Sequence, residues 1–282
     1  MSDAKPFGTR TQRALEKFGP LCVGIDPHPG LLAAWGLDAS AAGVREFGLR
    51  VVDAAADRVA IVKPQVSFFE RWGSAGFAAL EAVLAAARAA GLIVIADAKR
   101  GDIGTTMDAY GAAWLTPGSP LEADALTVNP FLGIGTLDDT FRLAERSGKG
   151  VFVLAATSNP EALAGQRAVG TAGATVSAAI IAEVSERNDH TTPDGEWASL
   201  GFVIGATVDW AEAGIRPFSP PAPILAPGFG HQGAGPADLA RRFGEMAPYV
   251  IASESRSILA AGPQGLAVAI EARVSEYRGT RG

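Results

Sequence analysis

The chain is poor in the residues that build disulfides and transition-metal sites. It has one cysteine, Cys22, and three histidines, His28, His190 and His231, which lie far apart in the sequence. A single cysteine excludes an intrachain disulfide and a cysteine-rich metal site. No His-x-x-x-His pair is present, so metal catalysis through imidazole has no support. Cys22 lies in the apolar run of residues 21–25, which favours a buried packing thiol over a nucleophile.

Long apolar runs and an excess of positive charge are also missing. No stretch reaches the roughly 18 to 20 apolar residues needed to cross a bilayer, and the first residues lack the basic and apolar segments of a signal peptide. The net charge is −6, whereas nucleic-acid binding calls for a concentrated basic face. We therefore expect a cytoplasmic protein that binds neither membrane nor nucleic acid. A small anionic substrate is compatible with this charge if cations gather locally.

Short apolar runs alternate with segments of helical length along the 282 residues. Strands without a polar face are typical of parallel sheets that are covered on both sides. Eight such runs match the strand count of a single α/β domain, a (β/α)8 or TIM barrel, over residues 1–282. The predicted strands are residues 21–25, 59–62, 92–96, 125–128, 151–155, 202–204, 224–226 and 250–252.

Two segments depart from this alternation. Residues 1–19 are predicted to form a helical extension before the first strand, with an amphipathic helix over residues 7–17 that closes the floor of the barrel. Residues 185–199 are polar and contain Pro193 and Gly195, which predicts a surface loop before the sixth strand.

The strongest functional signal is the segment Asp-Ala-Lys-Arg-Gly-Asp-Ile-Gly-Thr-Thr at residues 97–106. It directly follows the third predicted strand, so its charges lie at the carboxyl edge of the sheet, where α/β enzymes place their active sites. Side chains alternate along a strand, so Asp97 and Lys99 point the same way, whereas Asp102 lies beyond a glycine turn. An Asp-x-Lys pair alone is more often a solvated ion pair of little energetic effect.

Two more charges stand at the ends of other predicted strands. Asp26 and Lys63 each follow an apolar run and each precede a proline. A lysine buried there without a partner would be costly, so a carboxylate such as Asp97 is expected beside it. Structural ion pairing explains two of Lys63, Asp97, Lys99 and Asp102 more easily than all four. We interpret these four as a network of alternating charge in one pocket.

A glycine-rich loop and an arginine follow the last two predicted strands. Residues 227–233 are Pro-Gly-Phe-Gly-His-Gln-Gly, and Arg256 follows the eighth strand. Loops after the seventh and eighth strands of barrels often bind phosphate through backbone N–H groups, and arginine offers a forked donor to phosphate oxygens. A glycine-rich loop by itself is more often only a turn, but its position opposite the charged cluster favours a phosphate site.

Together these segments resemble the orotidine 5′-phosphate decarboxylase family, in the longer bacterial form found in actinobacteria. The matching segments run in order from the first strand to the eighth, so the resemblance covers nearly the whole chain. Its most specific part is the combination of Asp-x-Lys-x-x-Asp with Lys63 and Arg256. The segments are residues 24–29, 63–70, 97–106, 127–133, 156–160, 227–233 and 256–258.

The resemblance implies a barrel that converts orotidine 5′-monophosphate to UMP and carbon dioxide, a step of pyrimidine biosynthesis, without a metal or an organic cofactor. It makes Lys99 the acid that protonates pyrimidine C6. Asp97 then faces the departing carboxylate, and Lys63 completes the network and contacts the ribose.

The resemblance also implies a homodimer with shared active sites. Asp102, together with Ile103 and Thr106, is expected to enter the site of the neighbouring subunit. The other expected substrate ligands are Asp26 for a ribose hydroxyl, Ser158 for the pyrimidine edge, and Gln232 and Arg256 for the phosphate.

Two alternatives stay open at this point. One is a sugar-phosphate decarboxylase or aldolase of the same superfamily, such as 3-keto-L-gulonate 6-phosphate decarboxylase. These enzymes use Mg²⁺ and, by resemblance, carry a carboxylate where this chain has Lys63, a cation that would repel the metal. The other is a non-catalytic barrel that binds nucleotide phosphates, against which the presence of all four charged residues argues.

Overall fold

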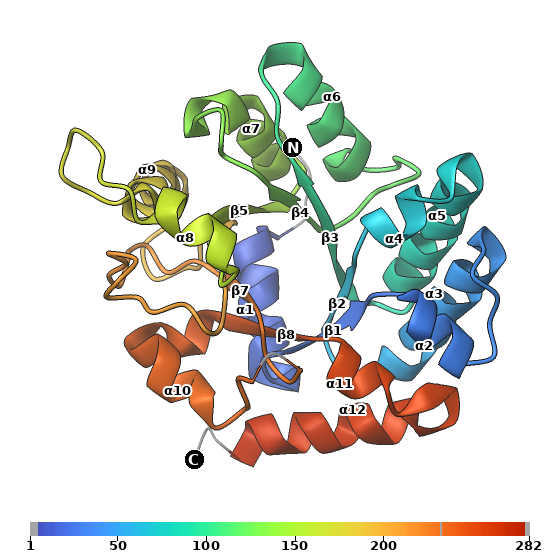
Figure 1. Ribbon diagram of the computed structural model, residues 1–282. Coiled ribbons are helices and arrows are strands. Elements are labelled where there is room, and N and C mark those ends of the chain that lie inside the picture. Colours follow the sequence, from blue (N-terminus) through green and yellow to red (C-terminus); the bar gives the residue numbers. More distant parts are fainter. Residues whose placement is uncertain (1–4, 232, 280–282) are drawn as a thin grey trace.

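The computed structural model describes residues 5–231 and 233–279 of the chain. Eight parallel strands pair in chain order and close into a barrel, because β1 pairs with both β2 and β8. Figure 1 shows the helices arranged around this ring of strands. The predicted (β/α)8 barrel is therefore confirmed. Its strands are β1 (Leu21–Ile25), β2 (Ile61–Pro64), β3 (Ile93–Arg100), β4 (Ala125–Val128), β5 (Gly150–Ala156), β6 (Leu200–Ile204), β7 (Ile224–Pro227) and β8 (Val250–Glu254).

The helices that cover the barrel follow the strands in chain order. Two short 3-10 helices, η1 (Ile134–Leu137) and η2 (Gly244–Tyr249), follow β4 and precede β8, respectively. The α-helices are α1 (Phe7–Phe18), α2 (Pro29–Ala34), α3 (Ala41–Ala55), α4 (Ser67–Glu70), α5 (Gly73–Ala89), α6 (Gly104–Leu115), α7 (Asp138–Arg146), α8 (Pro160–Gln166), α9 (Val176–Thr191), α10 (Asp238–Phe243), α11 (Arg256–Leu259) and α12 (Gly262–Gly279).

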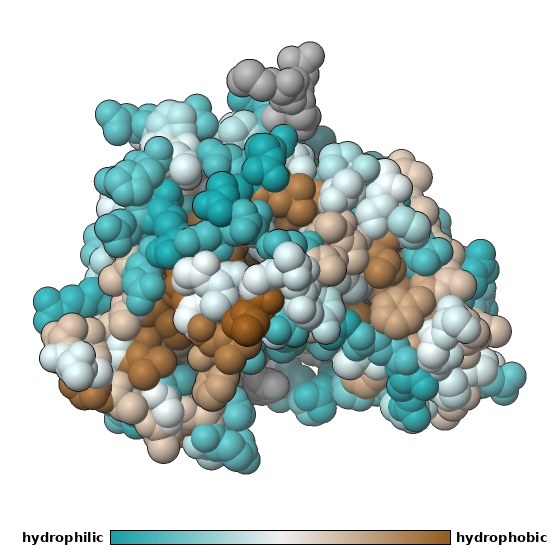
Figure 2. Space-filling view, turned by 90° about the horizontal axis from the view of Figure 1, so that it is seen from above, coloured by the Kyte–Doolittle hydropathy of each residue, from teal (hydrophilic) through white to brown (hydrophobic). Residues whose placement is uncertain are grey.

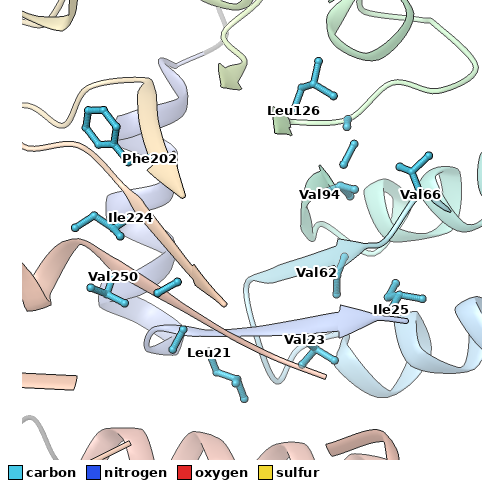
Figure 3. Packing of buried hydrophobic residues seen from close by; sticks show 14 of the residues in the cluster. Leu21, Val23, Ile25, Val62, Val66, Val94, Leu126, Phe202, Ile224 and Val250 are labelled. Carbon is cyan, nitrogen blue, oxygen red and sulfur yellow. The ribbon is translucent and has the colours of Figure 1, made fainter. Parts of the chain in front are cut away.

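Alternation along the strands divides the buried residues into two cores. On β1, Leu21, Val23 and Ile25 belong to the large core between strands and helices, part of which is seen in Figure 3. Cys22 belongs to a second core inside the barrel. Because successive side chains of a strand point to opposite faces, one apolar run supplies both cores. The buried position of Cys22 agrees with the packing role expected for it, and burial raises the pKa of its thiol to about 12.

Helix α1 closes the end of the barrel at which the strands begin. Phe7 is fully buried and its ring lies edge-to-face against that of Phe152, with 5.9 Å between the ring centroids. Arg10 donates to the Asp124 carboxylate at 2.8 Å, just before β4 begins. The helix expected as the barrel floor is thus present, at Phe7–Phe18, and the opposite end of the barrel is left for chemistry.

The expected surface loop over residues 185–199 is wrong for its first half. Helix α9 continues to Thr191, because one of its faces stays buried through Val184 and Asn188. The Asn188 side-chain amide donates to the Leu200 carbonyl at 2.8 Å and ties the helix to β6. The irregular segment is shorter, residues 192–199, and even there Trp197 is buried. The segment is polar overall because the buried face of this helix is narrow, and for that reason its composition predicted a loop.

The outer surface carries no continuous apolar belt in the view of Figure 2, in which hydrophobic side chains gather in separate patches among hydrophilic ones. Within residues 5–231 and 233–279, no helix is both long enough and apolar enough to span a bilayer.

Candidate active site

Two oppositely charged side chains lie inside the barrel near the carboxyl ends of β2 and β3. Ile61 and Ile95 belong to the inner core. Because side chains two residues apart on a strand point to the same face, Lys63 and Asp97 also point into the barrel. The Lys63 ammonium lies 2.9 Å from Asp97 Oδ2, and the two side chains are only 7% and 10% exposed. The carboxylate expected beside the buried lysine is Asp97.

Lys99 completes the charged cluster from the same strand as Asp97. Its Nζ lies 2.5 Å from Asp97 Oδ1, while its side chain is 44% exposed. The backbone is irregular here: the register between β3 and β4 shifts after Ala96, and Lys99 has a φ of +49°. The Lys99 N–H donates to Thr127 Oγ1 at 2.9 Å, which anchors this unusual conformation to β4. The ammonium is thus fixed at the edge of the cavity but open to a ligand.

The two ammonium groups determine the protonation of Asp97. Burial would raise the pKa of this carboxyl, but Lys63 and Lys99 outweigh burial and hold the pKa well below its usual range. Burial would likewise lower the pKa of Lys63, yet the charges of Asp97 and Asp26 raise it above its ordinary value. Near neutral pH, a fixed carboxylate therefore stands beside a fixed buried ammonium.

These charges line a cavity of about 260 Å³ at the carboxyl ends of the strands. Asp26 contributes from the segment after β1, and its Oδ1 is buried without a hydrogen-bond partner among the described residues. Ser255 Oγ, in the segment after β8, is also buried without a hydrogen-bond partner among the described residues. Buried polar atoms are rarely left unpaired, so Asp26 Oδ1, which can only accept, fits a hydroxyl group of a ligand, and the Ser255 hydroxyl fits either a hydroxyl or a phosphate group.

The far wall of this cavity is the surface expected to hold phosphate. Pro227 is the last residue of β7, Gly228, Phe229 and His231 come from the segment after it, and Arg256 is the first residue of α11. Among the described residues, Arg256 has no hydrogen bond or ion pair to its guanidinium, which leaves its donors available. The cavity thus has a charged cluster at one wall and a glycine-rich wall with an arginine at the other.

Four of the predicted site residues lie away from this cavity within one chain. Asp102 accepts from the Ile103 N–H at 2.8 Å and does not reach the cluster. Ile103 is 59% exposed, and Thr106 is exposed on α6. Ser158 lines a separate cavity of about 170 Å³ beside α8. Gln232 lies outside the described residues.

Sequence reasoning missed two side chains that hold the cluster together. Thr127 is fully buried, and its hydroxyl donates to Asp97 Oδ1 at 3.1 Å while it accepts from Lys99. The Gln65 amide donates to the Asp97 carbonyl at 3.2 Å and lines the cavity. Thr127 belongs to a segment that carries the family resemblance, and a hydroxyl in an apolar strand opposite a charged one is a usable signal.

A larger cavity of about 540 Å³ lies between α7, α9 and residues 191–200. None of the predicted site residues that the structure describes lines it, so the smaller cavity at the strand ends is the candidate site.

Comparisons with known proteins converge on one family. The family described as "Orotidine 5′-phosphate decarboxylase / HUMPS family" matches residues 19–269. The curated protein of Salinispora arenicola named orotidine 5′-phosphate decarboxylase is 52% identical over 257 residues, which cover 91% of each chain. Its namesake from Streptomyces coelicolor is 50% identical over 262 residues, covering 92% of this chain and 91% of the other.

Solved structures agree with the sequence comparisons. A crystal structure from Streptomyces avermitilis, of a protein described as a candidate orotidine 5′-phosphate decarboxylase, superposes with a TM-score of 0.93 at 46% identity and covers 99% of this chain and 97% of that one. The Leishmania donovani OMP decarboxylase has a TM-score of 0.77 at 27% identity, with 96% and 97% covered.

Proposed function

Since the chain belongs to the orotidine 5′-phosphate decarboxylase / HUMPS family, we propose that the cavity around Lys63, Asp97 and Lys99 is where it decarboxylates orotidine 5′-monophosphate to UMP. The observation that carries this placement is the buried Lys63–Asp97 pair with Lys99 at 2.5 Å, at the catalytic end of the barrel. This reaction is a step of pyrimidine biosynthesis.

Lys99 is the residue whose position suits proton transfer to carbon. Cleavage of the bond between C6 and the carboxylate leaves an electron pair at C6 that the ring does not delocalise. A fixed ammonium beside C6 stabilises that charge as it develops. Lys99 Nζ then donates a proton to form the C6–H bond and becomes a neutral amine, which regains its proton from solvent because the side chain is 44% exposed.

Asp97 and Lys63 prepare the site for this step. The low pKa of Asp97 keeps a negative charge where the substrate carboxylate would lie, so repulsion is relieved when carbon dioxide leaves. Lys63 holds Asp97 in place and contacts the ribose. Binding energy from the remote phosphate offsets the cost of bringing the two negative groups together.

The remaining substrate contacts are part of the same proposal. Asp26, with its unpartnered buried Oδ1, accepts a hydrogen bond from a ribose hydroxyl. Arg256 binds the phosphate together with Gln232, and Ser158 binds the pyrimidine edge. Ser158 lies close to the end of β6, since a Cβ on Gly205, directly after that strand, would lie 3.3 Å from the Ser158 nitrogen, and Val203 of β6 lines the candidate site.

We also propose a homodimer in which Asp102, Ile103 and Thr106 enter the partner's site. The support is their position around the start of α6, away from their own cavity, where Ile103 and Thr106 are exposed and Asp102 is half-buried. The loop that follows the next strand, β4, also exposes large apolar side chains, with Phe131 88% and Leu132 49% exposed. Exposed apolar groups of this size are typical of interaction surfaces. The cytoplasmic location expected from the sequence stays a prediction.

The two alternative functions are not favoured. Curated relatives at about half identity over most of the chain are named orotidine 5′-phosphate decarboxylase. Lys63 also places an ammonium, tightly paired to Asp97, where a Mg²⁺-dependent relative would need a metal-binding carboxylate.

The test follows the absorbance of orotidine 5′-monophosphate in the presence of EDTA, with UMP binding measured by titration calorimetry. We expect full turnover in the chelator. Loss of activity in EDTA that Mg²⁺ restores would favour the metal-dependent alternative, and UMP binding without turnover would favour the non-catalytic barrel.

A further inference from the structure

Glu254 is a buried carboxylate that the proposed chemistry does not use. It is the last residue of β8, and its side chain is 0% exposed. Its neighbour Ser253 lines the substrate cavity. Because strand side chains alternate, Glu254 points the other way, into the layer between the barrel and the helices. A carboxylate buried this deeply is tolerated only when it is paired and hydrogen-bonded.

Three side chains from α11 and α12 satisfy Glu254. Tyr277 donates to Oε1 at 2.8 Å, Ser257 donates to Oε2 at 2.9 Å, and Arg273 Nε lies 3.1 Å from Oε2. Burial and then the charge of Glu254 raise the pKa of the Tyr277 hydroxyl, which therefore stays a donor. Ser257 directly follows Arg256, so this bond fixes the turn that carries the phosphate-binding arginine.

The glycine-rich segment after β7 rests directly on the same group. Gly230 has a φ of +74°, and a Cβ at this position would lie 2.6 Å from Glu254 Oε2 and 2.3 Å from Ser257 Oγ. Only glycine allows this approach. Phe229 adds a second contact, with its ring 6.0 Å from that of Tyr277. The loop around Gly230 and the turn that carries Arg256 thus both contact the Glu254 carboxylate, on the side that faces away from the cavity.

We propose that Glu254 is a positioning residue for the substrate phosphate, which holds Arg256 and the loop around Gly230 in their binding geometry from behind the cavity. The inference rests on the proposed function and adds a residue to its phosphate end. Glu254 does not touch the reacting atoms, so its effect is specific to substrates that carry the phosphate.

The test compares two substrates, orotidine 5′-monophosphate and orotidine, in the variant Glu254→Gln. Glutamine keeps the size of the side chain but cannot accept from both Ser257 and Arg273 with the same strength. We expect kcat/KM for the nucleotide to fall about tenfold or more, and kcat/KM for orotidine to stay within about twofold. Tyr277→Phe, which keeps the ring, is expected to give a smaller shift in the same direction.

The matched control is Asp124→Asn. Asp124 is another buried carboxylate, held by Arg10 and the Val94 N–H at the opposite end of the barrel. This variant is expected to lose stability but to keep the ratio of the two kcat/KM values. If Glu254→Gln does not fold, Tyr277→Phe and Ser257→Ala carry the test.

Each outcome has one meaning. An equal loss for both substrates in the Glu254, Tyr277 and Ser257 variants overturns the positioning role, while a wild type that decarboxylates the nucleotide leaves the proposed function intact. A wild type without that activity overturns the proposed function and this inference with it. A lower ratio in the Glu254 variant, with an unchanged ratio in Asp124→Asn, supports the inference.

Discussion

Removal of Asp97 and removal of Lys99 should lower the free energy of unfolding by very different amounts, although both charges belong to the same cluster. Asp97→Asn leaves the buried Lys63 ammonium beside a neutral amide, whereas Lys99→Ala removes a cation that is 44% exposed. Breaking a buried pair by removing one partner costs about 3 to 5 kcal/mol, because a charge stays buried without compensation. An exposed pair contributes about 0 to 1 kcal/mol. The two variants should therefore separate in stability.

Activity should respond in a different order from stability. Removal of the proton donor costs roughly 10²- to 10⁴-fold in rate, and loss of a charge that stabilises the transition state roughly a further 10²- to 10³-fold. Lys99→Ala should therefore reduce kcat by at least about 10⁴-fold. It should lose less than about 1 kcal/mol of unfolding free energy and should still bind UMP.

The assay pairs urea unfolding with turnover of orotidine 5′-monophosphate. Lys149 offers a matched control, because Lys149→Ala removes a lysine that pairs with Glu122 at 2.7 Å beside the barrel floor. It should lower stability but leave kcat nearly unchanged. A Lys99→Ala protein that retained about a tenth of the wild-type kcat would refute its role as proton donor. Equal destabilisation by Asp97→Asn and Lys99→Ala would refute the division between buried and exposed charge.

Three further predictions concern the phosphate, the dimer and pH. Arg256→Ala should lower kcat/KM for the nucleotide by about 2 to 5 kcal/mol; equal processing of orotidine and its phosphate by the wild type would contradict the phosphate site. Subunit exchange between Lys99→Ala and Asp102→Ala dimers should restore roughly a quarter of wild-type sites, because half the dimers are hybrids with one intact site each. No recovery despite verified exchange would place Asp102 in its own subunit's site. The stability advantage of the wild type over Asp97→Asn should persist above pH 4 and shrink as the pH falls below 3.8, the ordinary pKa of aspartate, because the folded-state pKa is lower. Asp139→Asn, at an exposed pair, should show no such change in urea unfolding at pH 3 and pH 6.

Much of the fold and part of the site were predictable from the sequence. The eight apolar runs match the eight strands within a few residues, because a buried parallel strand needs apolar side chains on both faces. The same alternation places Lys63 and Asp97 on the interior face. Their proximity was predictable as well, since a buried lysine requires a carboxylate. The order of the motifs along the chain was enough to identify the family.

Other features depend on contacts between elements, which no local pattern contains. The continuation of α9 to Thr191 rests on the bond of Asn188 to Leu200, and the left-handed backbone of Lys99 rests on Thr127 across the sheet. The meeting of Glu254 with Tyr277 joins the end of β8 to the last helix, 23 residues further along the chain. Periodicity determines which face of an element is buried, but only the closed barrel and its register determine which side chains meet there.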